Sequence, residues 1–180
     1  LALTAMIFAT IVGITLGVIA ATRPNSMLDR ACTTGSVLGI SFPSFFVGII
    51  LQLVFAYLLA SVTGLNMTGD LYVTDGYTGE QYLELRNLIL PAIALGVRPV
   101  AVITQLTRSA MIDVMHNDYI RTARAKGLNE RVILFRHALK NALNPVVTSV
   151  SGWLASLLTG AFFIEAIFNY NGIGYETVNA

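Results

Sequence analysis

Charged residues are scarce in this sequence and unevenly placed. Only 12% of its 180 residues are charged and 55% are hydrophobic, whereas soluble domains carry about 25% charged residues. The ranges 1–22 and 31–69 contain no charged residue. Uncharged apolar runs of 18 or more residues are typical of membrane-spanning helices. The alternative, a soluble protein with buried helices this long and this apolar, is disfavoured by the same length rule.

The groups that catalytic and metal sites need are also few. The single cysteine, Cys32, excludes an intrachain disulfide and a cysteine-rich metal site. His116 and His137 stand 21 residues apart with no cluster of cysteines or carboxylates around them, so we expect no metal site. No Gly-x-x-x-x-Gly-Lys-Ser/Thr run is present, which excludes ATP binding by that motif. We therefore expect no catalytic residue, no metal and no cofactor bound by this chain.

The apolar stretches predict an all-α fold, a polytopic helical membrane protein with about four spans present. The spans are expected at about 1–22, 38–62, 88–107 and 145–168. The first covers roughly 33 Å at about 1.5 Å per residue, enough for the hydrocarbon core of a bilayer. Gly13 and Gly17 are four residues apart, a spacing that suits close helix packing; the alternative, that glycine is simply common in membrane helices, stays open. Pro43 predicts a kink near the start of the second span.

The distribution of charge indicates the orientation. Nine of the eleven Lys and Arg residues lie in 23–30 and 108–140, and by the positive-inside rule both segments are cytoplasmic. The acidic loop 63–87 and the last stretch, 169–180, are then external, which agrees with four spans. The loop 63–87 lacks the ligand spacing of a calcium-binding loop. We expect it to be a solvated loop with turns.

The cytoplasmic loop 108–144 carries seven basic residues against three acidic ones. Its pattern predicts two short helices with a bend between them. The first helix is expected over 119–126, with Asn117 or Asp118 as its N-cap. Gly127 follows at the position where a left-handed residue ends many helices, and glycine adopts that conformation at little cost.

The second helix is expected to begin after Asn129, whose side chain can cap it. It carries an apolar stripe with basic residues between its members: Val132, Ile133, Phe135, Leu139 and Ala142. We expect Pro145 to end this helix, because the residue before a proline is pushed out of the helical region. Two amphipathic helices joined at an angle would form a rigid unit rather than a flexible tether.

The central stretch resembles a known motif. The run DYIRTARAKG, followed by RHALKNAL and a proline, resembles the cytoplasmic loop of ABC-transporter permeases. That motif reads Glu-Ala-Ala, three residues, glycine, nine residues and Ile-x-Leu-Pro, and His137 to Lys140 stand at its last four positions. Gly127 stands at the glycine and Arg121-Thr122-Ala123 at Glu-Ala-Ala. Arg121, Thr122, His137 and Lys140 depart from the general pattern, and this variant is similar to the dipeptide/oligopeptide/nickel permease family. Further matches are LDR at 28–30, LILPAIALG at 88–96, LTRSAM at 106–111 and NGIG at 171–174.

The resemblance implies the type I ABC importer permease fold, in which one subunit has about six spans. Because about four are present and the chain begins at Leu1 without a charged leader, we expect a fragment of such a unit. The implied partners are a second permease, homologous or identical, two ABC ATPase subunits that carry ATP and Mg, an extracytoplasmic substrate-binding protein and the lipid bilayer, with no nucleic acid. The implied location is the inner membrane of a bacterium or archaeon. The resemblance implies a peptide, nickel or a related small solute as substrate.

Coupling to the ATPase is assigned by the resemblance and by the basic pattern to the loop 118–145. The residues expected to couple are Asp118, Tyr119, Arg121, Thr122, Ala123, Arg124, Ala125, Lys126, Gly127 and Arg136. Their charges suit an acidic or polar rim on the partner, and Tyr119, Ile120, Ala123 and Ala125 are candidates for apolar contact. The alternative is a basic loop lying on anionic lipid headgroups. The glycine-centred spacing favours docking.

Three polar residues inside the predicted spans are candidates for the translocation path or its gate: Arg98, Gln52 and Glu165. A charge at the position of Arg98 is costly in a bilayer, so it is expected to face the bundle interior, a cavity or a partner. We favour structural or gating use of Arg98 over direct contact with substrate. Gln52 either bonds across helices, the favoured reading, or faces a pore.

Two other functions remain open at this point. A secondary transporter would need buried acidic residues in mid-span, and the only acid in a span is Glu165 near one end. A membrane anchor or scaffold without transport would not need the costly Arg98 or a proline-kinked third span.

Overall fold

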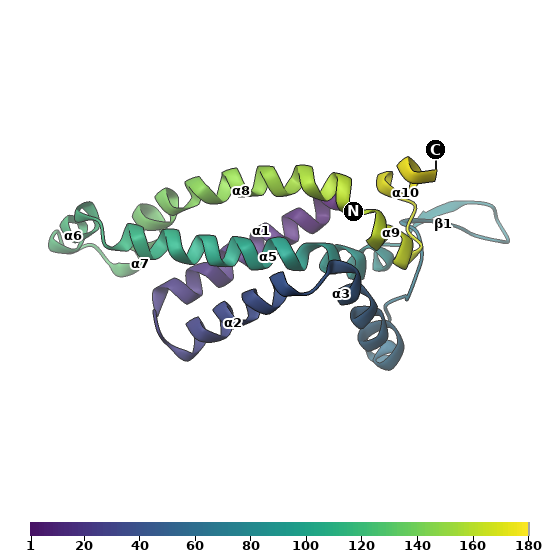
Figure 1. Ribbon diagram of the computed structural model, residues 1–180, viewed down its shortest axis with the longest axis horizontal. Helices are drawn as coiled ribbons and strands as arrows, with labels where there is room; N and C mark the ends of the chain where they lie inside the picture. Colours follow the sequence, from purple (N-terminus) through teal and green to yellow (C-terminus); the bar gives the residue numbers. More distant parts are fainter. Residues whose placement is uncertain (180) are drawn as a thin grey trace. The chain divides into compact units, whose positions relative to one another are not determined.

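The structure, a computed structural model, describes residues 1–179, with the side chains of residues 159, 160, 178 and 179 outside that description. It is all-α apart from one small hairpin, as predicted (Figure 1). It forms two compact units. Unit 1 contains Leu1–Phe8, Phe42–Val97 and Leu154–Ala180, and unit 2 contains Ala9–Ser41 and Arg98–Trp153.

Two helices are each long and apolar enough to cross a membrane: α1 (Ala2–Thr22) and α5 (Arg86–Met115). Two bent pairs, Met27–Ser41 with Ser44–Leu58 and Glu130–Leu158 with Phe162–Phe168, raise the number of candidate spans to as many as four. These segments overlap the four predicted spans. The topology across a membrane stays a prediction.

The second predicted span, 38–62, is not one helix. The chain forms α2 (Met27–Ser41), α3 (Ser44–Leu51), a π-helix η1 (Gln52–Leu58) and α4 (Ala60–Thr63). The kink expected at Pro43 is a complete break, because Pro43 has the extended conformation (φ −62°, ψ 140°) and caps α3.

The polar loop predicted at 23–30 is shorter than expected, because α2 already begins at Met27. Ser26 caps the helix, since its Oγ accepts from the Asp29 amide at 3.3 Å. The sequence pattern, a serine followed three residues later by an acidic residue, is typical of a helix N-terminus.

The prediction that Pro145 ends a helix is wrong. After α7 (Glu130–Val132) and the π-helix η2 (Ile133–Ala138), the helix α8 runs from Leu139 to Gly160 with Pro145 inside it. A proline removes one hydrogen bond from the ladder, and membrane helices tolerate that loss where neighbours satisfy the freed group. Similarly, α5 continues through both of its prolines to Met115, so the loop predicted from residue 108 begins about two turns later.

In unit 2, α1 and α5 approach closely at two glycines, which favours the packing reading of Gly13 and Gly17. A Cβ atom on Gly13 would lie 2.7 Å from Cγ2 of Ile103, and one on Gly17 would lie 2.5 Å from Cβ of Thr107. Neither distance leaves room for a methyl group. The two glycines therefore set the spacing of the two helices.

In unit 1, α3 packs against α9 (Phe162–Phe168), which is followed by α10 (Ile173–Asn179). The acidic loop holds an unexpected antiparallel hairpin of β1 (Tyr72–Thr74) and β2 (Gln81–Leu83), with Val73 opposite Tyr82. It projects away from α9 in Figure 1. The loop is tied to the C-terminal segment, because the Asp70 carboxylate accepts from the backbone and side-chain amides of Asn171.

Matched alanine substitutions at two helical glycines test the α1–α5 packing. Gly17→Ala should lower the free energy of unfolding by about 1–3 kcal/mol, because its Cβ would also lie 2.8 Å from the Thr104 carbonyl oxygen, which cannot rotate away. Gly35→Ala, in α2 with no atom within 4 Å, should instead raise it by about 0.5–1 kcal/mol. Unfolding in detergent, followed by temperature or denaturant, measures both. Equal effects of the two substitutions would contradict the close approach.

Candidate coupling site

The first helix predicted in the loop 108–144 is present as α6 (Asp118–Ala125). Gly127 has φ of +77°, the predicted left-handed conformation. Its amide donates to the Arg124 carbonyl at 2.9 Å, and the Leu128 amide donates to the Ala123 carbonyl at 3.3 Å. This pair of bonds is the Schellman motif, which supplies hydrogen-bond donors to carbonyls that would otherwise have none at the end of a helix. The helix therefore ends in a defined geometry.

The second helix begins as predicted. The Asn129 side chain accepts from the Arg131 amide at 2.9 Å and caps α7. Between the two helices, Arg124 and Glu130 form an ion pair with 2.8 Å between Nε and Oε1. Both side chains are exposed, by 41% and 65%, so the pair adds at most about 1 kcal/mol. We call residues 118–132, which hold α6, the turn and α7, the elbow.

One face of α6 is buried in a cluster that we call the elbow core. Its members come from α1, α5, α6, η2 and α8: Val18, Ala21, Met111, Ile120, Ala123, Ile133, Ala138 and Ala142. Ile120 is fully buried and Ala123 is 7% exposed. These two residues were expected to contact a partner, and the structure instead places them inside the chain. The periodicity of an amphipathic helix gives an apolar face but not the identity of what covers it.

The other face of α6 is exposed. Nine of the ten residues expected to couple are exposed, on α6, in the turn that follows it, and in η2. They are Asp118, Tyr119, Arg121, Thr122, Arg124, Ala125, Lys126, Gly127 and Arg136. Asp118 and Arg121 form a surface ion pair at 3.4 Å. The Tyr119 hydroxyl accepts from Asn141 Nδ2 of α8 at 3.0 Å. Asn141, which the sequence did not single out, therefore holds the one aromatic side chain of this face in place.

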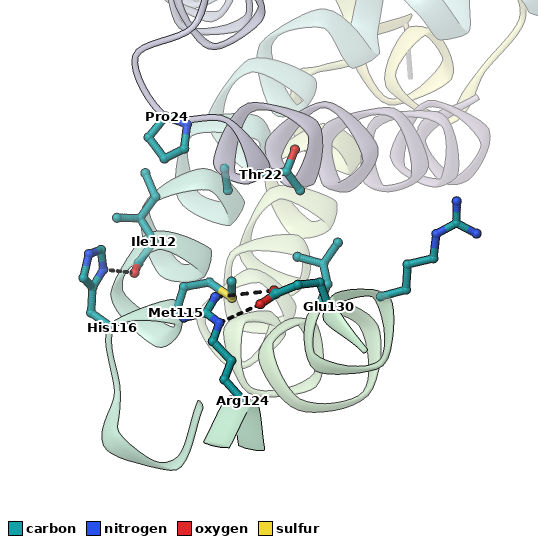
Figure 2. Close-up of a pocket in the computed structure, with 10 residues that line it drawn as sticks. Thr22, Pro24, Ile112, Met115, His116, Arg124 and Glu130 are labelled. Atoms are coloured by element: carbon teal, nitrogen blue, oxygen red, sulfur yellow. Dashed lines mark hydrogen bonds and ion pairs between the residues drawn. The ribbon is translucent and has the colours of Figure 1, made fainter. Parts of the chain in front are cut away.

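A cavity of about 530 Å³ lies between the elbow and the ends of the long helices. It is lined by residues of the α1 end, the α5 end and the elbow: Ala21, Thr22, Pro24, Ile112, Met115, His116, Arg124, Glu130, Arg131 and Leu134. Figure 2 shows Arg124 and Glu130 joined beside it and His116 directed at the Ile112 carbonyl. The turn at 22–24 thus lies beside the elbow. The two basic segments predicted on one side of the membrane are neighbours.

The three polar residues predicted for the translocation path differ in their surroundings. Gln52 is 8% exposed, and its amide nitrogen donates to the carbonyls of Met67 at 2.9 Å and Ile167 at 3.1 Å. Gln52 therefore bonds between segments, the reading that the sequence favoured. Arg98 is exposed and forms no hydrogen bond or ion pair within residues 1–179.

Glu165, the third of these residues, is 3% exposed. Its carboxylate accepts from the Tyr175 amide at 2.7 Å, in the first turn of α10. The same carboxylate occupies the space that a Cβ on Gly172 would need. Glu165 thus holds the turn that carries the NGIG run. A use of Gln52, Arg98 or Glu165 in transport stays a prediction.

One buried ion pair was not predicted. Arg108 of α5 donates from Nε and Nη2 to the two carboxylate oxygens of Asp29 in α2, with 2.8 Å between Nη2 and Oδ2. The partners are 79 residues apart, so no local spacing could have indicated the pair. Within the described residues, no group of three or more His, Cys, Asp or Glu side chains is placed to hold a metal ion.

The chain resembles known membrane transport components. The family model described as the inner membrane component of binding-protein-dependent transport systems matches residues 13–180. The chain is 43% identical to the dipeptide transport system permease protein DppB of Bacillus subtilis, over 99% of this chain and 54% of that protein. It is 41% identical to the di/tripeptide transport system permease protein DppB of Pseudomonas aeruginosa, over 100% of this chain and 57% of that protein.

The DppB protein of Escherichia coli gives a similar result, with 38% identity over 98% of this chain and 57% of that protein. The chain thus spans about half the length of the curated relatives it matches. The matched region includes the elbow and every member of its core. The chain belongs to the family of binding-protein-dependent transport system inner membrane components.

Proposed function

We propose that this chain is part of a permease subunit of an ATP-driven importer of small peptides, and that the elbow couples it to an ATPase. The observation that carries the proposal is the two-sided environment of α6. Its apolar face is enclosed in the elbow core, while its opposite face presents exposed basic residues. A helix built in this way is available to a partner on one side and fixed to the bundle on the other.

Force applied to α6 would reach the long helices through the elbow core. Ile120 belongs to the same buried cluster as Met111 of α5 and Val18 of α1. Packed side chains at interior density transmit displacement instead of absorbing it. The Schellman motif and the Asn129 cap fix the two ends of the bend. The elbow would therefore move as one body with the ends of α1, α5 and α8.

The remaining partners follow from the family and are part of the proposal. Two ATPase subunits would bind ATP and Mg and hydrolyse ATP, and this chain would contribute no catalytic residue. A second permease would complete the pathway, and an extracytoplasmic protein would deliver substrate. Dipeptides are the first substrates to test, because the relatives' names describe dipeptide and di/tripeptide transport. The location would be the inner membrane of a bacterium or archaeon, crossed several times.

A secondary transporter is the weaker alternative. It would need an acid in mid-span that is free to couple an ion to transport. Glu165, the only acid in the predicted spans, lies near one end of its span and accepts from the Tyr175 amide. A scaffold without transport would not require an exposed, partner-free Arg98 in a membrane helix. Family membership also favours a transport role over either alternative.

Replacing Gly127 tests the bend. Gly127→Val should strain the left-handed residue by about 1–2 kcal/mol without a clash, since no atom lies within 4 Å of the new Cβ. We expect loss of dipeptide uptake with continued ATP hydrolysis in the complete transporter reconstituted in vesicles. Gly127→Asn is the matched control, because asparagine tolerates this conformation, and it should retain uptake. Undiminished uptake by Gly127→Val at normal membrane levels would contradict the proposal.

Charge reversal on the exposed face tests docking. The double substitution Arg121→Glu and Lys126→Glu should reduce the ATPase that co-purifies with the permease by roughly tenfold, or about 1.4 kcal/mol. The reduction should grow smaller at high salt, because salt screens exposed charges. Arg23→Glu with Arg30→Glu, an equal charge reversal at two exposed residues outside the loop 118–145, is the control. Equal losses for the double variant and the control would contradict docking through α6.

A further inference from the structure

The buried pair of Asp29 and Arg108 has the geometry of a strong, directional contact. Arg108 binds both carboxylate oxygens of Asp29, and the Asp29 side chain is 3% exposed. The Asn25 amide donates to Oδ2 at 2.8 Å and the Thr33 hydroxyl to Oδ1 at 3.4 Å. A two-point contact between a guanidinium and a carboxylate fixes orientation as well as distance.

This pair is the main buried attachment of α2. Of the 15 residues of α2, only Asp29 and Ser36 are buried. Ser36 bonds to the Cys32 carbonyl of its own helix. No apolar side chain of α2 is fully buried, and those of Cys32 and Ile40 are half-buried. Membrane helices gain no hydrophobic driving force from one another. The attachment of α2 to α5 therefore rests on the ion pair more than on apolar burial.

The pair also lies close to the elbow core. Arg108 precedes Met111 by three residues, about one turn of α5, and Met111 is a fully buried member of that core. A displacement of α6 that moves Met111 would therefore move Arg108 with it. Through Asp29, the start of α2 would follow.

Stability alone does not account for this ion pair. The desolvation of Asp29, and the partial desolvation of Arg108, whose side chain is 27% exposed, cancels much of their attraction. What the pair supplies is one allowed geometry between α2 and α5. We propose that Asp29 and Arg108 are positioning residues that make α2 follow α5 when the ATPase moves the elbow. This inference builds on the proposed function, since it needs an ATPase acting on α6.

The test uses the complete transporter, with its second permease, ATPases and binding protein, reconstituted in vesicles and supplied with a labelled dipeptide. Asp29→Asn removes the charge and keeps the shape. We expect the variant to retain its ATPase and to hydrolyse ATP, because the elbow is untouched. The dipeptide transported per ATP hydrolysed should fall roughly tenfold. Glu84→Gln, which removes a surface ion pair with Arg86, is the control and should leave this ratio unchanged.

A further variant separates positioning from folding. The double variant Asp29→Asn with Arg108→Gln leaves no unpaired buried charge, so it should assemble and still show the reduced ratio. If the variants lose assembled transporter but keep the wild-type ratio per assembled complex, the pair is only structural and the inference is overturned. A wild-type transporter that hydrolyses ATP without any dipeptide uptake would instead overturn the proposed function. The inference about Asp29 and Arg108, which rests on that function, would then fall as well.

Discussion

The enclosure of α6 by the elbow core is the constraint on which the rest of the account depends. An isolated helix of eight residues is not stable in water, because nucleation costs more than so few hydrogen bonds return. Here Ile120 and Ala123 are buried among side chains of α1, α5, η2 and α8. The helix exists because the bundle covers it, and it moves with the bundle for the same reason. A flexible tether with the same charges would have no way to transmit a displacement.

Polar contacts hold the parts that apolar packing leaves loose. In unit 2, Asp29 and Arg108 attach a helix that fully buries no apolar side chain. In unit 1, Gln52 joins the carbonyls of two separate segments, and Glu165 holds the first turn of α10. Such contacts suit a membrane protein, in which lipid competes for apolar surfaces but not for buried donors and acceptors. They are also directional, so each unit has a defined internal geometry.

Features set by local backbone chemistry could be predicted from the sequence. The left-handed Gly127, the Asn129 cap and the close packing at Gly13 and Gly17 each follow from what one residue type permits. Features that depend on residues far apart in the chain could not be predicted from the sequence. Nothing in the sequence indicates that Asp29 meets Arg108, or that the apolar face of α6 is covered by its own chain. Pro145 shows a local rule overridden, because α8 continues through it, as membrane helices with an internal proline can.

The central claim, that α6 moves as one body with α5, is tested most directly by a distance measurement. Spin labels on Thr122→Cys of α6 and Ser109→Cys of α5, both exposed, would be placed in the complete transporter with Cys32→Ser removing the native thiol. Pulsed electron paramagnetic resonance then gives the label separation with and without ATP. The account predicts a narrow distribution that nucleotide leaves unchanged. A broad distribution, or one that shifts when ATP binds, would contradict it.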